Sequence, residues 1–239
     1  MTYDTLDDDL DAGVETSLSY VICSTPRSGS YLLCELLWRT GGGGAPEEFF
    51  HPDFMPRLMR RWGVETLDDY VAALLEHKTS ANGVFGAKVH WGQYQPVLGD
   101  RDITKLFPNT RFIHISRGDR LRQAVSWVRA MQTLGWKSSA RDRREVSYDA
   151  EDIAAKLRRL EGDEGRWRAL FERHGIEPYE VVYEELAERP GEIVGELMEW
   201  AGIDAPGAPP PQAALRRQAD TTSDEWVRRF LAEQPATSG

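Results

Sequence analysis

Residues 19–31 of the chain read SYVICSTPRSGSY, and this stretch decides the fold. The apolar run at 19–24 is typical of a buried strand. The polar loop at 25–30 follows it, and leucines then recur at helical spacing across 32–37. A loop that enters a helix faces free backbone N–H groups and the positive end of the helix dipole. The stretch therefore predicts an anion-binding loop between a strand and a helix.

The residues of this loop suit a phosphate or a sulfate. Gly29 lets the backbone approach an anion closely, Ser28 and Ser30 add hydroxyl donors, and Arg27 adds a permanent charge with forked donors. A kinase-type loop requires GxxxxGK[ST], but this loop is shorter and has no lysine. The GxSxG elbow of hydrolases is absent too, since Leu32 stands at the place of its second glycine. An ordinary helix-capping turn remains the structural alternative.

The rest of the chain alternates predicted strands with predicted helices. Further strands are expected at 84–90, 111–116 and 179–183, and helices at 67–77 after a Thr66 cap, 119–133, 150–173, 192–201 and from Ser223 onward. Such alternation predicts an α/β fold with a central parallel sheet flanked by helices. We expect residues 1–18 to form a flexible acidic N-terminal tail and residues 19–239 to form a single domain.

Composition excludes several classes of protein. The chain has 239 residues and a net charge of −10, which argues against nucleic-acid binding. No apolar run is long enough to span a bilayer and the first residues do not resemble a secretory signal, so we expect a cytoplasmic protein without stable membrane insertion. Its two cysteines and the spacing of its histidines favour neither a disulfide framework nor a metal site.

The loop sequence STPRSGSYLL resembles the 5′-phosphosulfate-binding loop of sulfotransferases that use 3′-phosphoadenosine 5′-phosphosulfate (PAPS). The resemblance is strongest to the bacterial Stf-zero family, whose best-known member sulfates trehalose, and it implies a three-layer P-loop-like fold. Tyr31 stands where many of these loops have a second small hydroxyl residue. Further similar segments follow in the family's order: PEEFF at 46–50, NGVFGAKVHW at 82–91, IHISRGDRLRQAVSWVRAMQT at 113–133 and RQADTTSDEWVRRF at 217–230.

Three further residues are similar to the family's site for the 3′-phosphate of the donor. Arg117 ends the predicted strand at 111–116, and Ser126 follows nine positions later within the next helix. A fork donor with a hydroxyl on rigid elements suits a doubly charged phosphate. Arg217 resembles the basic element that covers this phosphate in many sulfotransferases. The alternative is two solvated surface arginines and an ordinary helix serine.

Glu48 is the candidate general base. Phe49 and Phe50 follow it directly, and we expect them to shield the carboxylate from water and to raise its pKa. In the trehalose-sulfating relatives, the glutamate before the two phenylalanines is the proposed base, and that position is Glu48 here. The alternative is a solvated loop carboxylate beside core phenylalanines. His51, which titrates near neutral pH, is the second candidate.

Lys88 lies inside an apolar predicted strand, where an unpaired charge is costly. It is the candidate for neutralising the reacting sulfonate or the bridging oxygen, and a lysine snorkelling from a strand end is the alternative.

The resemblance implies a sulfotransferase that moves a sulfonate group from PAPS to a hydroxyl of a carbohydrate or glycolipid-like acceptor. PAPS would be a co-substrate and adenosine 3′,5′-bisphosphate a product, with no metal and no tightly bound cofactor. Sulfation of a hydroxylated natural product and a non-catalytic adenine-nucleotide-binding module are the alternatives. A homodimer is left open.

Overall fold

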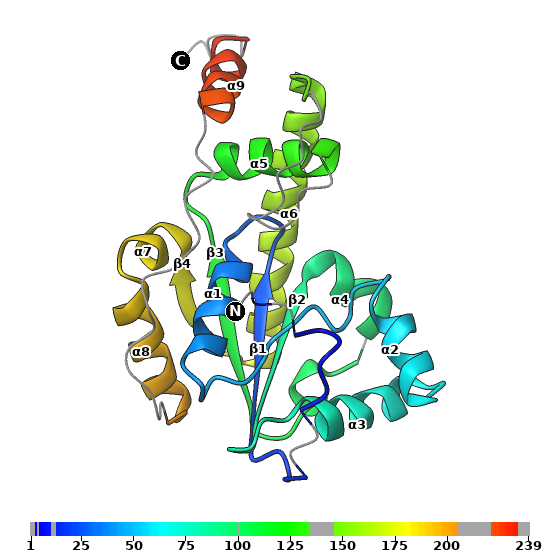
Figure 1. Ribbon diagram of the computed structural model, residues 1–239. Coiled ribbons are helices and arrows are strands. Elements are labelled where there is room, and N and C mark those ends of the chain that lie inside the picture. Colours follow the sequence, from blue (N-terminus) through cyan, green and yellow to red (C-terminus); the bar gives the residue numbers. More distant parts are fainter. Residues whose placement is uncertain are drawn as a thin grey trace.

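The computed structural model describes residues 3, 5–10, 13–99, 101–133, 146–204 and 221–233. Four parallel strands form one sheet with the order β2-β1-β3-β4, as Figure 1 shows. Their bounds are β1 Leu18–Ser24, β2 Val84–His90, β3 Thr110–Ser116 and β4 Tyr179–Val182. These are the four strands expected from the apolar runs, and the predicted α/β fold class is confirmed.

Helices cover both faces of the sheet. The side chains that alternate along β1 therefore enter two apolar clusters, one on each face. Tyr20 and Ile22 lie in one apolar cluster, whereas Val21 and Cys23 lie in the other. The first cluster is covered by α1 Ser30–Arg39, α7 Tyr183–Glu188 and α8 Pro190–Ala201, and the second by α2 Met55–Trp62, α3 Leu67–Lys78, α4 Trp91–Leu98 and α6 Ala150–His174. The 3₁₀ turn η1 Ile103–Lys105 precedes β3.

A third apolar cluster lies beyond the sheet, where α5 Arg120–Thr133 and α9 Thr221–Glu233 pack with the first part of α6 (Figure 1). The predicted cap at Ser223 is not the start of α9, which begins two residues earlier at Thr221. Ser223 is instead buried within the helix, where its hydroxyl accepts a hydrogen bond from Arg129. The predicted cap of α3 is confirmed, since Thr66 accepts a hydrogen bond from the Asp69 N–H at 3.1 Å.

The N-terminal segment does not behave as the expected tail over its described residues. Tyr3 is only 1% exposed and packs against Tyr31 and Trp38 of α1. Leu6 is also buried, and its carbonyl accepts a hydrogen bond from the Lys78 Nζ at 2.9 Å. Burial of these apolar side chains outweighs the solubility of the neighbouring aspartates. The assignment of residues 19–239 to one domain stays a prediction.

None of the helices in the described part of the chain combines the length and the apolar character that crossing a bilayer requires.

Candidate active site at the carboxyl edge of the sheet

The topology gathers the predicted site residues at one edge of the sheet. All four strands are parallel, so the loops that follow β1, β2 and β3 leave from the same side. The chain passes from β1 to β2 on one side and then to β3 on the other side of β1. The order of the strands therefore reverses between β1 and β3, which is where open α/β sheets bind ligands. The loop at 25–29 follows β1 at this point, and Arg117 follows β3.

The loop after β1 has the backbone of an anion cradle. Arg27 and Gly29 both adopt positive φ angles, of 63° and 90°, and α1 begins at the next residue, Ser30. The Ser28 hydroxyl is buried, and it has no hydrogen-bond partner within the described residues. A buried hydroxyl without a partner is rare, because desolvation of the group is not compensated. An anion bound in the loop would supply the missing partner.

Two buried side chains on helices fix the start of this loop. The Gln123 amide of α5 donates to the Thr25 hydroxyl at 2.9 Å and to the Pro26 carbonyl at 2.8 Å. The Trp167 indole of α6 donates to the Ser24 carbonyl at 2.9 Å. These contacts hold the loop in place before any ligand arrives. Nothing in the local sequence indicated either residue, because both lie on helices distant in sequence from the loop.

Arg27, Arg117 and Ser126 form one cluster at the switch point. The Arg27 Nε donates to the Ser126 hydroxyl at 3.0 Å, and the Arg117 Nη1 donates to the Arg27 carbonyl at 3.3 Å. Burial lowers the pKa of Arg27, and the neighbouring charges of Arg117 and Arg129 lower it further. Like charges brought together in a buried place favour a bound anion.

Tyr183, the first residue of α7, connects the loop to Arg117. The Arg117 guanidinium lies over the Tyr183 ring, 4.7 Å from its centre. The same ring packs so closely on Gly29 that a Cβ there would lie 2.3 Å from the Tyr183 Cδ2. Glycine is therefore needed at position 29 for two reasons: the close packing of Tyr183 and the positive φ angle. Arg217, the remaining predicted phosphate ligand, lies outside the described residues.

Glu48 lies at the centre of a second polar cluster on the same edge. Its Oε1 is 2.7 Å from the Nζ of Lys88, and its Oε2 accepts a hydrogen bond from the Gln93 amide at 2.6 Å. The Nε2 of His90 is 3.6 Å from Oε1. Lys88 and His90 come from the last residues of β2, and Gln93 comes from the first turn of α4. Lys88 is 3% exposed, so it is buried and paired and does not snorkel to solvent.

The pKa of Glu48 is shifted in the direction opposite to our expectation. Burial alone would raise this pKa, but Lys88 and His90 outweigh burial and hold it well below its usual range. For Lys88, burial lowers the pKa, but the neighbouring Glu48 carboxylate raises it by more, so the pKa of Lys88 lies above its usual value. Phe49 and Phe50 do not shield the carboxylate, since both are fully buried and pack against Phe85 and Tyr70 of the core.

The neighbours of Glu48 in sequence face elsewhere. The Glu47 carbonyl accepts a hydrogen bond from the Lys88 N–H at 2.9 Å, and its buried carboxylate accepts one from the Thr5 N–H at 3.3 Å. The His51 ring packs on Phe54 with 4.5 Å between the ring centres. The Glu48 carboxylate, at 2.7 Å, forms the ion pair with the buried Lys88.

The two clusters are in contact with each other. The His90 Nδ1 is 2.8 Å from the Ser24 hydroxyl, at the residue that precedes the loop. The Lys88 Nζ lies 5.6 Å from the centre of the Tyr31 ring, and Tyr31 follows the loop directly. A carboxylate, a buried lysine and an anion cradle thus share one edge of the sheet. His90 and Gln93 were not predicted, although their positions two and five residues after Lys88 were the available signal.

Two mycobacterial enzymes resemble this chain over most of its length. The chain is 35% identical to a trehalose 2-sulfotransferase of Mycobacterium tuberculosis (strain ATCC 35801 / TMC 107 / Erdman), with 90% of this chain and 95% of the relative covered. It is 34% identical to a trehalose 2-sulfotransferase of Mycolicibacterium smegmatis, with 89% and 94% covered.

A sulfotransferase structure from Alicyclobacillus acidocaldarius shares the fold, with a TM-score of 0.51 and 15% identity over 89% of this chain and 90% of that one. The family model of the Stf0 sulphotransferases matches residues 19–233. The chain therefore belongs to the Stf0 sulphotransferase family and is a transferase enzyme.

Proposed function

We propose that this sulfotransferase moves a sulfonate group from PAPS to a hydroxyl of a sugar or sugar-containing small molecule, with Glu48 as the general base. The observation that carries the proposal is the contact between the two clusters. A carboxylate paired with the buried Lys88 lies beside a loop whose Ser28 hydroxyl needs a partner. An anion-binding module would need only the loop, whereas transfer also needs a proton acceptor next to it.

The donor would bind along the switch point. The loop at 27–30 would hold the 5′-phosphosulfate with its backbone N–H groups, the Arg27 side chain and the hydroxyls of Ser28 and Ser30. Arg117 and Ser126 would hold the 3′-phosphate, and Arg217 would cover it. Because Arg117 would otherwise lack a doubly charged partner, a nucleotide without the 3′-phosphate should bind much more weakly.

The reaction would be an in-line attack of the acceptor oxygen on the sulfur of the donor. A new O–S bond forms, the bond between sulfur and the bridging phosphate oxygen breaks, and the acceptor proton passes to Glu48. Arg27, Lys88 and the loop N–H groups would stabilise the charge that grows on the departing phosphate. If the Lys88 ammonium pairs with the bridging oxygen in place of the Glu48 carboxylate, Glu48 loses its strongest stabilising partner. Its pKa then rises, which makes it a better base.

The acceptor is proposed from the two mycobacterial relatives, whose names state that they act on trehalose. A sugar hydroxyl is therefore the first acceptor to test. Glycolipids and hydroxylated natural products are the next two classes, because acceptor pockets diverge faster than donor loops.

Two measurements test the proposal. Isothermal titration with adenosine 3′,5′-bisphosphate, AMP and ATP should show tight binding of the first alone. Incubation with PAPS labelled in its sulfonate and with trehalose, glucose, a trehalose glycolipid or a phenolic natural product should then transfer the label to one of the sugars. Bisphosphate binding without transfer to any hydroxyl would leave a binding module, and tight binding of all three nucleotides would contradict the donor assignment.

A further inference from the structure

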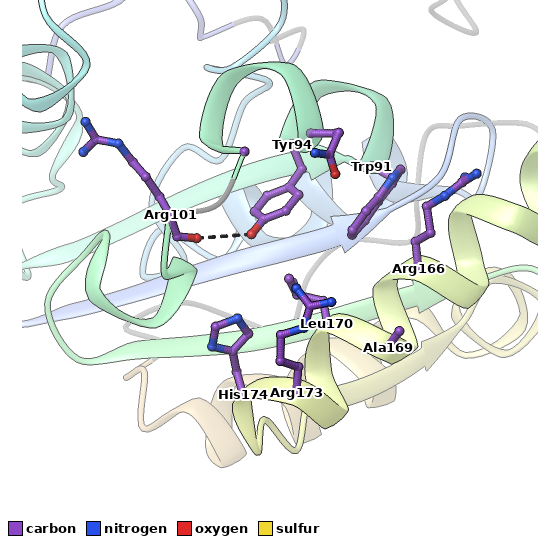
Figure 2. Close-up of a pocket in the computed structure, with 10 residues that line it drawn as sticks. Trp91, Tyr94, Arg101, Arg166, Ala169, Leu170, Arg173 and His174 are labelled. Atoms are coloured by element: carbon purple, nitrogen blue, oxygen red, sulfur yellow. Dashed lines mark hydrogen bonds between the residues drawn. The ribbon is translucent and has the colours of Figure 1, made fainter.

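A cavity lies between α4 and α6, away from the proposed sulfonate-transfer site. Its volume is about 310 Å³, and neither the loop at 25–30 nor Glu48 or Lys88 lines it. Figure 2 shows Trp91 and Tyr94 of α4 opposite residues of α6. Trp91, Tyr94 and Leu170 are all buried, so they form an apolar wall. The volume suits one small organic molecule.

Among the residues that the structure describes, the arginines Arg101, Arg166 and Arg173 and the imidazole of His174 line this cavity, and no described aspartate or glutamate does. The His174 Nδ1 lies 3.4 Å from the Asp102 Oδ1 just outside it. Arg101 and Arg166 each contact an aspartate through one terminal nitrogen, Nη1. Arg173 makes no ion pair within the described part of the chain. Guanidinium donors thus remain for a ligand, and their fork geometry matches the oxygens of a phosphate or a sulfate.

The aromatic wall is held rigid by its own packing. The Trp91 ring meets Trp167 edge-on at 5.1 Å between ring centres and lies 5.2 Å from Tyr94. The Tyr94 hydroxyl donates to the Arg101 carbonyl at 3.3 Å, as the dashed line in Figure 2 marks. Rings fixed in this way lose little entropy when a ligand ring packs on them.

We propose that the α4–α6 cavity binds a sugar-sized ring compound that carries a phosphate or a sulfate ester. The ester would pair with Arg166 and Arg173, and the ring would pack on Trp91. A neutral ligand would leave Arg173 without an anionic partner, whereas an inorganic anion would leave the aromatic wall in contact with water. Only a ligand with both parts uses both features of the cavity.

Isothermal titration tests the proposal on the full chain saturated with adenosine 3′,5′-bisphosphate, which keeps the probes away from the donor loop. The probes are glucose 6-phosphate, glucose 6-sulfate, glucose, and sodium phosphate or sulfate. We expect at least one ester to bind about tenfold or more tightly than glucose and than its own inorganic anion. The comparison of the two esters identifies which group the cavity takes.

Paired variants place the binding. Arg166→Gln with Arg173→Gln should weaken ester binding by about tenfold or more, because both charged donors are lost. The fold should persist, since Arg159 still pairs with the buried Asp163 at 2.8 Å. Arg158→Gln, which changes an exposed arginine of the same helix that does not line the cavity, is the matched control and should bind like the wild type.

Three results would overturn the proposal: no ester binding to the wild type, equal affinity for the ester and its inorganic anion, or wild-type affinity in the double variant. The cavity shares no residue with the donor loop, so the double variant should bind adenosine 3′,5′-bisphosphate like the wild type. A failure of the cavity proposal can therefore be told apart from a failure of the donor assignment. If the bisphosphate itself does not bind, the same titrations are run without it, and the variant comparison still decides.

Discussion

Glu48 is held as an ionised carboxylate by Lys88 and His90, so its chemistry should be separable from donor binding. Glu48→Gln keeps the shape of the side chain and removes its basicity. We expect turnover to fall by about 10²–10⁴-fold, the usual contribution of a general base, with little change in affinity for adenosine 3′,5′-bisphosphate. Steady-state kinetics with labelled PAPS and titration of the bisphosphate measure the two quantities.

The matched control for this variant is Glu47→Gln, one position away. The Glu47 carboxylate accepts a hydrogen bond from the Thr5 N–H, and the ion pair with Lys88 belongs to Glu48, so turnover of Glu47→Gln should stay near that of the wild type. Wild-type turnover in Glu48→Gln would remove Glu48 from the mechanism. A strong loss in Glu47→Gln alone would transfer the role to that carboxylate.

Arg117 should distinguish nucleotides by their 3′-phosphate. Its guanidinium is held over the Tyr183 ring and against the Arg27 carbonyl, so Arg117→Ala removes a positioned fork donor. We expect affinity for adenosine 3′,5′-bisphosphate to fall by about tenfold or more, while affinity for AMP hardly changes. Equal losses for the two nucleotides in titration would show that Arg117 does not contact the 3′-phosphate.

At the residue scale, prediction from sequence succeeded where a charged residue stands among apolar ones. Lys88 within an apolar strand indicated a charge that needs an anionic partner if it is buried, and it is buried and paired with Glu48. Its role toward the sulfonate stays a prediction. The same reasoning was wrong about the pKa of Glu48, because it used the neighbours in sequence, Phe49 and Phe50. The groups that set this pKa, Lys88 and His90, lie on β2, and they come beside Glu48 because Glu47 pairs with Ala87 of that strand.

At the scale of elements, the turn from β1 into α1 is the most constrained junction. Gly29→Ala would place a Cβ 2.3 Å from Tyr183 at a φ of 90°, so the loop or the ring must move. We expect affinity for adenosine 3′,5′-bisphosphate to fall by about tenfold or more, since the cradle depends on this backbone. Titration of the purified variant measures the loss.

Gly41→Ala is the control, because Gly41 also has a positive φ, of 73°, but nothing lies within 4 Å of its added Cβ. It should lose about 1 kcal/mol of unfolding free energy through backbone strain and keep its nucleotide affinity. If both variants lost the same affinity, general destabilisation and not the shape of the cradle would explain the Gly29 result.

Elements with continuous apolar runs or long helical periodicity were predicted, whereas three short helices were not. α4 contains Gly92 and Pro96, so its local propensity argues against a helix. α2 has only eight residues, too few for helical periodicity to be recognised, although Pro56 in its first turn is compatible with a helix. α7 is six residues long and follows β4 without a break. Packing against the sheet stabilises these segments, which is a tertiary effect that propensity does not contain.

Across the whole molecule, His114 links stability to pH. It is fully buried on β3, 3.0 Å from Glu164 and 2.8 Å from Glu180. Burial lowers its pKa, but the two carboxylates outweigh burial and raise it from 6.5 to about 9. The charged form therefore stabilises the folded state fully below about pH 6.5. This contribution is lost as the pH rises through about 9.

Denaturant unfolding of the wild type and of His114→Gln at pH 6 and pH 10 measures this contribution. The wild type should exceed the variant by more at pH 6 than at pH 10, because glutamine cannot carry the charge at either pH. An equal difference at the two pH values would mean that His114 contributes through packing against Phe171 and not through its charge.

The buried N-terminal segment has a consequence for the order of events during synthesis. Tyr3 is synthesised before its contacts Trp38 and Pro46, which follow about forty residues later, and Lys78, which binds the Leu6 carbonyl, follows later still. The segment therefore cannot dock fully until α3 is complete. A protease has access to this segment in that interval, before it docks.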